Sequence, residues 1–390
     1  MKQGKQAFDR SRRAFTAAGL VLGLGFAWQG AGAQSKAPIV IGASLQLSGP
    51  VAYVGESARQ GIDLQVDAIN AAGGLLGRPV KIVYRDHENV PDKAVTNVRE
   101  MIERDQVVAF VGESSSGTAL AAGPVIGAAN LPWVISVATN TSITKRPQNT
   151  TAYRVSPYDG LQAPFVIREA LRRYKKVAIL ADNSGYGQGG RQDLLAALKA
   201  ANQKPVADET YNIGEPDMTA QLSRIRSSGA EVIVLWSLGP DAAQIRRNMR
   251  TMNYQLPTIG GWGLENTSFT KLAGRFAEGT IIVSVDPLAK NTPAVNAYRA
   301  AYDKKIGLAK MEYPSAVALS YDAMGLLAAA IRKAGTTDSK AVITALQSVD
   351  YDGVIKHYHA PWSATQREAL SLDDLHLVVV KDGKFQPYTE

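Results

Sequence analysis

The sequence contains no cysteine and only four histidines among its 390 residues. Without cysteine, the chain has no disulfides, thiolate metal sites, thiol catalysis or lipid-modified N-terminal cysteine. Aromatic residues are also sparse, at 7%, whereas hydrophobic residues reach 45% and charged residues 20%. This balance is typical of globular domains with buried cores, and the length predicts about two or three of them.

A strong charge of one sign is also missing from most of the chain. The formal net charge is +8, but five of the 43 basic residues and only one of the 35 acidic residues lie within positions 1–33. The excess that remains is small and spread over the rest of the sequence. Because nucleic-acid binding requires a concentrated basic surface, we expect no nucleic-acid partner.

The N-terminus has the three parts of an export signal. Residues 1–13 are polar and basic, residues 14–27 carry no charge, and Ala31-Gly32-Ala33 fits a cleavage site. The apolar run is too short for a membrane span, and we expect no other span in the chain. The pattern predicts a signal peptide over 1–33, cleaved near Ala33, and a periplasmic location. The pair Arg12-Arg13 resembles a twin-arginine signal, so both export routes stay open.

Short apolar runs alternate with longer amphipathic segments in two successive blocks. The first block extends from Ile39 to Val155 and the second from Val177 to Val285. Two βαβαβ blocks predict an α/β fold with two parallel sheets, each covered by helices on both faces. A helix-rich segment follows, and the chain ends in a predicted strand at His376–Val380 and a turn at 381–384.

Two motif matches suggest enzyme or nucleotide chemistry, and both are weak. Residues 185–190 fit G-x-G-x-x-G with Asp208 about 20 positions on, which is the dinucleotide fingerprint. Tyr186, however, fills the space where the backbone must approach a pyrophosphate, so a turn that presents Tyr186 is the better interpretation. Residues 142–145 fit S-x-x-K, but the K-T-G motif that accompanies it in penicillin-interacting enzymes is absent.

Catalytic and metal-binding residues are also scarce. No histidine lies in the six loops that we consider for ligand binding, which leaves Glu113 and Glu265 as the only candidates for acid–base chemistry. His357 and His359 could chelate a metal, but without a nearby acidic third ligand they are more typical of surface residues. We therefore expect no enzyme activity, no cofactor and no metal.

The loops after parallel strands are where open α/β sheets bind ligands, and one of them is rich in hydroxyls. The run Glu113 to Thr118 contains three serines and leads directly into a predicted helix. A helix N-terminus favours anions, and the hydroxyls and amides of Ser116, Gly117, Thr118 and Thr139 could together hold a carboxylate without a salt bridge. The alternative is that the serines only cap the helix.

Several segments together resemble the substrate-binding proteins of branched-chain amino-acid ABC transporters. They are Ile41-Gly42-Ala43, Leu47-Ser48-Gly49-Pro50, Gly61 to Asn70 with Gly73-Gly74, Gly112 to Ala122, Ile135-Ser136, Ala138-Thr139-Asn140 and Tyr186-Gly187. The resemblance implies a type I periplasmic binding fold, in which two doubly wound parallel-sheet lobes are joined by three hinge crossovers. The expected lobes are 38–156 with 286–365 and 157–285 with 366–390, with the ligand cleft between them.

The resemblance also assigns roles to individual positions in this cleft. Ser116 and Thr139 would hold a ligand carboxylate, and the Ala138 carbonyl would accept from an ammonium group. Further candidate wall residues are Tyr186 of the second lobe, Tyr53 and Val54 of the first loop, and Leu238.

Trp262 is the main departure from that family, which has a glutamate at this position to pair with the ligand ammonium. Glu265, Asp182 or Glu113 could replace the missing charge. The ligand therefore stays open between a branched-chain or other aliphatic amino acid and an aromatic or other organic acid, with amides a smaller alternative.

The sequence as a whole predicts a monomeric periplasmic solute-binding protein that closes on a small carboxylate and delivers it to a membrane permease of an ABC importer. An exported sensing receptor of the same fold is the first alternative. An exported amidase or dehydrogenase is the second.

Overall fold

The computed structural model describes residues 37–389, so the expected signal peptide lies outside the described residues. The first sheet has five parallel strands in the order β2-β1-β3-β4-β5. Their bounds are β1 Ile39–Leu45, β2 Val80–Asp86, β3 Ala109–Gly112, β4 Trp133–Ile135 and β5 Ala152–Arg154. This sheet defines what we call the first lobe.

The second sheet, which defines the second lobe, has seven strands in the order β14-β13-β10-β9-β8-β6-β7. Their bounds are β6 Val177–Asp182, β7 Ala207–Tyr211, β8 Val232–Trp236, β9 Thr258–Gly260, β10 Ile281–Ser284, β13 His376–Lys381 and β14 Lys384–Pro387. The inner strands of both sheets, such as β3 and β8, are short, apolar and fully buried, as expected where helices cover both faces.

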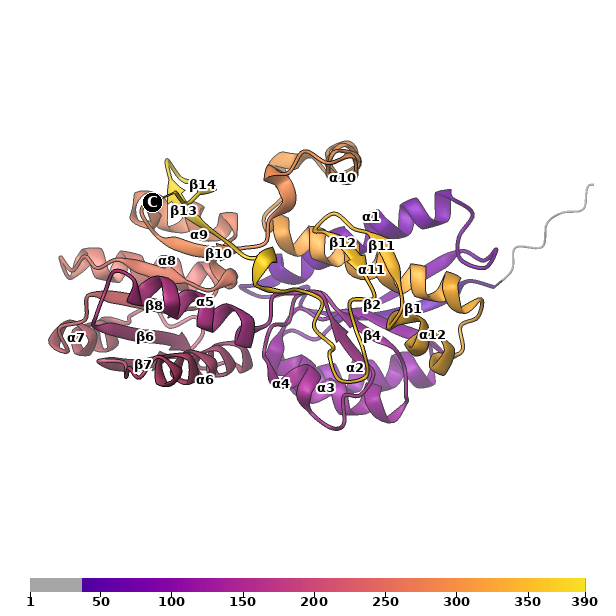
Figure 1. Ribbon diagram of the computed structural model, residues 1–390, viewed down its shortest axis with the longest axis horizontal. Coiled ribbons are helices and arrows are strands. Elements are labelled where there is room, and N and C mark those ends of the chain that lie inside the picture. The colour runs from indigo at the N-terminus through magenta and orange to yellow at the C-terminus, as the bar shows by residue number, and fades with distance from the viewer. Residues whose placement is uncertain (1–36, 390) are drawn as a thin grey trace, which may run out of the picture. The chain divides into compact units, whose positions relative to one another are not determined.

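Helices cover both faces of the first sheet (Figure 1). Helices α1 (Ala52–Ala71) and α11 (Pro314–Ala334) pack together on one face, and α2 (Pro91–Glu103) and α3 (Ser116–Ala128) on the other. The remaining elements of this lobe are α4 (Ser142–Lys145), α10 (Pro293–Lys305), α12 (Ser339–Leu346) and a small sheet of β11 (Asp350–Asp352) and β12 (His357–His359).

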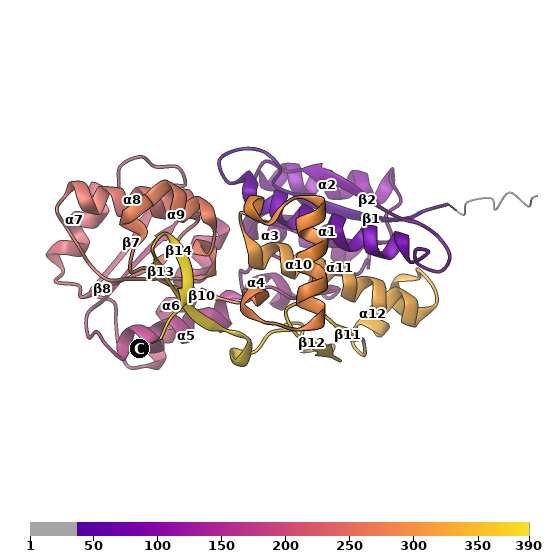
Figure 2. The same ribbon diagram turned by 90° about the horizontal axis from the view of Figure 1, so that it is seen from above.

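The second sheet is covered in the same way (Figure 2). Helices α5 (Asp159–Leu171) and α6 (Gly185–Ala200) pack on one face, and α7 (Thr219–Ser227), α8 (Gly239–Thr251) and α9 (Thr267–Ala273) on the other. Five short 3₁₀ helices complete the described chain: η1 Trp262–Leu264, η2 Gly274–Ala277, η3 Pro287–Ala289, η4 Leu308–Lys310 and η5 Leu372–Asp374.

Two details of the predicted pattern are corrected. The second sheet is mixed, because β13 pairs antiparallel with β10 and β14 antiparallel with β13. The predicted turn at 381–384 forms this last hairpin, with positive φ at Asp382 and Gly383, as a two-residue hairpin loop requires. Helix α1 begins at Ala52 rather than Ser57, so Tyr53 and Val54 lie in its first turn and not in a loop.

Helix α11 is the one described helix that is long and apolar enough to cross a membrane, although no membrane span was expected in this part of the sequence. Of its most apolar 18-residue window, 83% is buried inside the fold, mainly against α1 and the first sheet. The burial identifies α11 as the core helix of the first lobe.

The chain crosses between the sheets three times, as expected. The first two crossings fall at residues 155–158 and 285–287, and the third precedes β13. The amide of Ala369 still donates to the carbonyl of Arg154 at 2.9 Å, so the chain leaves the first sheet only after this residue. We propose lobes of 38–156 with 286–369 and 157–285 with 370–390, which moves the last boundary from Gln366.

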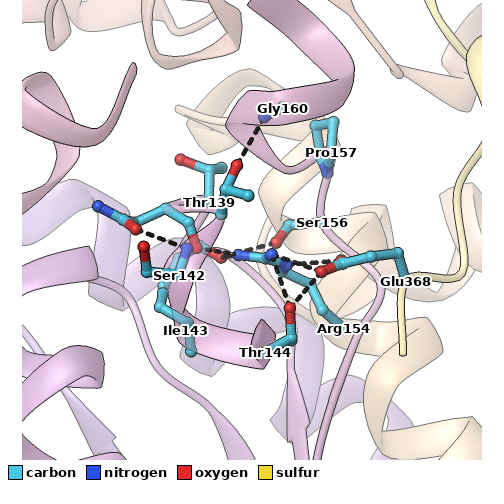
Figure 3. A network of polar contacts seen from close by, with 12 residues as sticks. Thr139, Ser142, Ile143, Thr144, Arg154, Ser156, Pro157, Gly160 and Glu368 are labelled. Carbon is cyan, nitrogen blue, oxygen red and sulfur yellow. Dashed lines mark hydrogen bonds and ion pairs between the residues drawn. The ribbon is translucent and has the colours of Figure 1, made fainter. Parts of the chain in front are cut away.

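A buried ion pair anchors this last crossing to the first sheet (Figure 3). Arg154, at the end of β5, is fully buried, and its Nε and Nη2 donate to the two Glu368 oxygens at 2.8 and 2.6 Å. Its Nη1 donates to the carbonyls of Asn140 at 2.8 Å and Ala138 at 3.3 Å. One guanidinium thus joins β5, the loop after β4 and the last crossing.

Replacing Glu368 with alanine leaves the Arg154 charge buried without its counter-charge. We expect a loss of about 3–5 kcal/mol in the free energy of unfolding, measured by urea denaturation. Lys305→Ala is the control, because it breaks the exposed Lys305–Asp67 pair and changes stability by less than about 1 kcal/mol. A Glu368 variant as stable as this control would show that the buried pair is not needed.

Candidate ligand-binding site

A cavity lies at the carboxyl ends of the strands of both lobes, where open α/β sheets bind small molecules. The lining residues are Gln46, Val54, Asn89, Ser114, Ser115, Ser116, Val137, Ala138, Thr139, Ser184, Tyr186, Ile213, Leu238, Trp262, Gly263 and Tyr313. None of these described lining residues carries a charged side chain.

Two helix N-termini, one from each lobe, meet at this cavity. Helix α3 begins at Ser116 and helix α6 at Gly185. A Cβ atom on Gly185 would lie 2.7 Å from the Cα of Gly117, so the two backbones approach as closely as glycine allows. Because each N-terminus carries a partial positive charge, their meeting point favours an anion.

Ser116 holds the loop after β4 in place and keeps a donor for a ligand. Its Oγ accepts hydrogen bonds from the amides of Thr139, at 3.3 Å, and Asn140, at 3.2 Å. A hydroxyl that accepts twice still has its own O–H to donate. The side-chain capping role considered from the sequence is not observed, since Ser115 is the N-cap and makes no such bond.

Two buried hydroxyls of the cavity lining make no hydrogen bond of regular geometry within the described residues. They are Thr139 Oγ1 of the first lobe and the Tyr186 hydroxyl of the second. Burial raises the pKa of Tyr186 well above its ordinary value, so the phenol keeps its proton and remains a donor. The Asp159 carboxyl lies beside Thr139 and the Gly263 backbone beside Tyr186, but without a regular hydrogen bond both hydroxyls are candidate donors to a ligand.

Thr118 and Gly117 do not line the cavity, contrary to the expectation. Thr118 Oγ1 donates to Glu113 Oε1 at 2.7 Å, and the same oxygen contacts Nε2 of the buried His87 at 3.1 Å. Glu113 also accepts from the Ser114 amide at 3.1 Å. Its carboxylate is therefore used inside the first lobe and does not face a ligand.

Glu265 is likewise sealed off, behind Trp262. The Trp262 Nε1 and the Ser315 hydroxyl donate to Glu265 Oε2 at 3.1 and 2.6 Å, and the Ser284 hydroxyl donates to Oε1. Burial, with Asp286 nearby, raises the pKa of Glu265. It lies outside the cavity lining and does not supply the charge that Trp262 replaces.

The other two acceptors considered for an ammonium group are Asp182, which does not line the cavity, and the Ala138 carbonyl. Asp182 Oδ1 accepts from the Ser184 amide at 2.9 Å and from its hydroxyl. Ala138 lines the cavity, and its carbonyl already accepts from Arg154 Nη1 at 3.3 Å and from Ser156 Oγ at 3.0 Å. A carbonyl oxygen has two lone pairs, so both are taken.

Of the remaining predicted residues, three line the cavity and one joins the two lobes. Val54, Leu238 and Trp262 line the cavity, and the Trp262 ring lies 4.9 Å from that of Tyr313. Tyr53 does not line it. Instead its hydroxyl accepts from the Gly239 amide at 3.3 Å, which joins α1 to the start of α8 in the other lobe.

Sequence analysis missed several lining residues. They are Gln46, Asn89, Ser114, Ser115, Val137, Ser184, Ile213, Gly263 and Tyr313. Asn89 and Ile213 follow β2 and β7. They could have been predicted, because ligands bind at the loops that follow parallel strands. Tyr313 precedes α11 and follows no strand, so no pattern in the sequence signals it.

The fold and this cavity define a two-lobed protein of the type I binding-protein class, with a cavity between two α/β lobes. The model of the periplasmic binding protein family matches residues 38–382, and the chain belongs to this family.

The relatives are of the leucine/isoleucine/valine-binding type. The chain is 31% identical to the Leu/Ile/Val-binding protein BraC3 of Rhizobium johnstonii, over 80% of this chain and 84% of that one. It is similar in structure to a type 1 periplasmic binding protein from Bordetella pertussis, with a TM-score of 0.84 and 27% identity over 90% of this chain and 100% of the other. It is also similar to the branched-chain amino acid binding protein LivJ of Streptococcus pneumoniae, solved with isoleucine, with a TM-score of 0.78 and 25% identity over 90% and 98%.

Asp159 is a buried acid next to the cavity wall that the sequence did not single out. It starts α5, and its amide donates to the Thr139 carbonyl at 2.9 Å. Its carboxyl oxygens make no regular hydrogen bond within the described structure. Burial raises its pKa to about 8, an effect that the neighbouring Thr139 hydroxyl and Trp236 indole offset only in part. The group is therefore mostly protonated at neutral pH.

A raised carboxyl pKa stabilises the folded state fully only below the unfolded-state pKa of about 3.8, and this contribution is lost as pH rises from there to the folded-state value of about 8. Asn resembles the protonated acid, so Asp159→Asn should match the wild type in stability near pH 4 and exceed it at pH 9. Urea unfolding at the two pH values measures this difference. Equal stability of both proteins at pH 9 would contradict the buried, protonated state.

Proposed function

We propose that the chain is the exported substrate-binding component of an ABC importer, and that it binds a small organic acid without an ammonium group. The observation that carries this proposal is a pair of hydroxyls without a regular hydrogen bond, Thr139 in the loop after β4 and Tyr186 in the first turn of α6, in a cavity lined by no charged side chain. These neutral donors match a carboxylate, which is stabilised by hydrogen bonds and helix ends without a fixed cation.

That the ligand lacks an ammonium group follows from the state of the hydrogen-bond acceptors around the cavity. An ammonium ion enclosed in a closed cavity costs several kcal/mol unless a negative charge or free carbonyl oxygens meet it. Here Glu265 is sealed behind Trp262, and the Ala138 carbonyl is saturated by Arg154 and Ser156. The relatives named for leucine, isoleucine and valine bind ligands that carry this group, so the proposed ligand class differs from theirs.

The apolar residues that line the cavity indicate the chemistry of the non-acidic part of the ligand. Trp262, Tyr313 and Leu238 form an apolar surface around the cavity, together with Val54 and Ile213. Aromatic faces bind flat rings and branched alkyl chains by area and stacking. An aromatic or branched aliphatic acid matches this combination of an apolar wall and a polar end.

Binding would act through closure of the lobes. In the structure the two lobes are joined over the cavity by hydrogen bonds from Asn140 Nδ2 to the Gly185 carbonyl, at 2.7 Å, and from Thr141 Oγ1 to Asp193, at 2.6 Å. A ligand that contacts both lobes favours this closed state, with the three crossings as hinges. The closed monomer would then dock on the permease in the membrane.

The same cavity offers no machinery for catalysis. Among the described lining residues, no side chain can act as a general base at neutral pH. This supports a binding role over an amidase or dehydrogenase. We further propose that residues 1–33 are removed on export to the periplasm.

Matched ligands that differ only in the ammonium group test the ligand class. We expect 4-methylpentanoate to bind at least about 100-fold more tightly than leucine in calorimetry, because the buried ammonium would lack a partner. The pair 3-phenylpropanoate and phenylalanine should behave alike. Tighter binding of the amino acids would refute the ligand class and leave the carboxylate site standing. Tighter binding of 4-methylpentanamide than of the acid would refute the carboxylate site itself.

A pair of threonine variants tests the site residues. Thr139→Val removes a hydroxyl without a regular hydrogen bond, so it should weaken 4-methylpentanoate binding by about 1–3 kcal/mol with little effect on stability. Thr118→Val removes a hydroxyl that Glu113 uses, so it should reduce the free energy of unfolding by a similar amount and change affinity far less. Calorimetry and urea unfolding separate the two effects, and the reverse result would exclude Thr139 from the site.

A further inference from the structure

The small sheet of β11 and β12 brings two histidines and two aspartates to one exposed face. The strands pair antiparallel with Asp350 opposite His359 and Asp352 opposite His357. Side chains alternate along a strand, so the histidines lie on the same side of β12, while Tyr358 between them is buried. The register therefore supplies the acidic neighbours that His357 and His359 lack in the sequence pattern.

The distances within this group are those of a preformed chelate. His359 Nδ1 lies 2.7 Å from Asp350 Oδ2, and His357 Nε2 lies 3.7 Å from Asp350 Oδ1. One ligand atom from each of these three residues lies within 4.8 Å of the others. The two imidazole rings stack at 6.5 Å with 13° between their planes, so both face the same region beside Asp350.

Asp352, the fourth residue of this group, orients His357. His357 Nδ1 lies 2.6 Å from Asp352 Oδ1, so Asp352 accepts a hydrogen bond from the Nδ1–H group. The Nε2 atom of His357, with its lone pair, is then on the side of Asp350. A carboxylate behind a histidine is the arrangement that holds metal-binding imidazoles in protein sites.

We propose that Asp350, His357 and His359 form a surface site for a divalent transition-metal ion such as Zn²⁺, with Asp352 as the positioning residue. Two imidazole nitrogens and a carboxylate oxygen are ligands that Zn²⁺, Ni²⁺ and Cu²⁺ prefer, whereas Mg²⁺ and Ca²⁺ prefer oxygen alone. The ion takes the place of the protons between the rings and Asp350, and water completes its coordination.

The site is independent of the ligand cavity. None of its residues lines the cavity, and the hairpin is anchored elsewhere, since Tyr358 donates to Asp322 of α11 at 3.2 Å. The Asp322 carboxylate also accepts from the amides of Val354 and Ile355, at 2.7 and 2.8 Å, in the turn before β12. A rigid hairpin of this kind keeps the three ligands together before the metal binds.

Titration of the untagged protein with ZnCl₂ in a calorimeter tests the site. We expect one ion per chain, and at least a tenfold weaker affinity in each of His357→Ala, His359→Ala and Asp350→Asn. Asp352→Asn should weaken binding by about tenfold through His357. His376→Ala is the matched control, because it removes a histidine outside the site and should leave binding unchanged.

Thermal unfolding without metal should be the same for all the variants, since the four residues are exposed and the changes leave Tyr358 in place. A protein that takes up no Zn²⁺, or variants at His357 and His359 that bind it as the wild type does, would overturn the proposal. Displacement of Zn²⁺ by an equal concentration of Mg²⁺ would overturn it as well.

Discussion

The buried guanidinium of Arg154 determines much of the geometry on which ligand binding depends. A charge with no exposed surface requires partners on every side, and Arg154 finds them in Glu368 and in the carbonyls of Ala138 and Asn140. The loop after β4 is thereby fixed with its carbonyl oxygens turned to Arg154 and its Thr139 hydroxyl free at the cavity. The same charge that holds the structure together thus removes an acceptor from the ligand site.

This arrangement explains how an anion can be bound in a cavity without a cation. The helix ends at Ser116 and Gly185 provide partial positive charge from both lobes, and hydroxyl groups provide the hydrogen bonds. A full salt bridge in a closed cavity would be costly to form and to break. Neutral donors give a weaker and more easily reversed contact, which suits a protein that must release its ligand to a permease.

Patterns along the chain were sufficient for the α/β class and for placing Ser116, Thr139 and Tyr186 beside the cavity, because strand ends and helix starts position the residues next to them. The three crossings, by contrast, were implied by the family resemblance. The roles of Glu265 and Ala138 could not be obtained in this way. Whether Glu265 faces a ligand depends on Ser284 and Ser315, which are far from it in sequence, and the lone pairs of Ala138 depend on Arg154 and Ser156.

The glycines at 185–190 show why a motif alone does not define a function. A Cβ atom on Gly189 would lie 2.1 Å from Asn140 Nδ2, and one on Gly190 would lie 2.0 Å from Trp236 Nε1. Asp208, the apparent ribose ligand, instead pairs with Arg191 at 2.6 Å. These glycines are needed because α6 packs against its own sheet and against the other lobe at the cavity. In a dinucleotide-binding motif, glycines let the backbone approach the pyrophosphate. In this protein they let the backbone of α6 approach other parts of the protein.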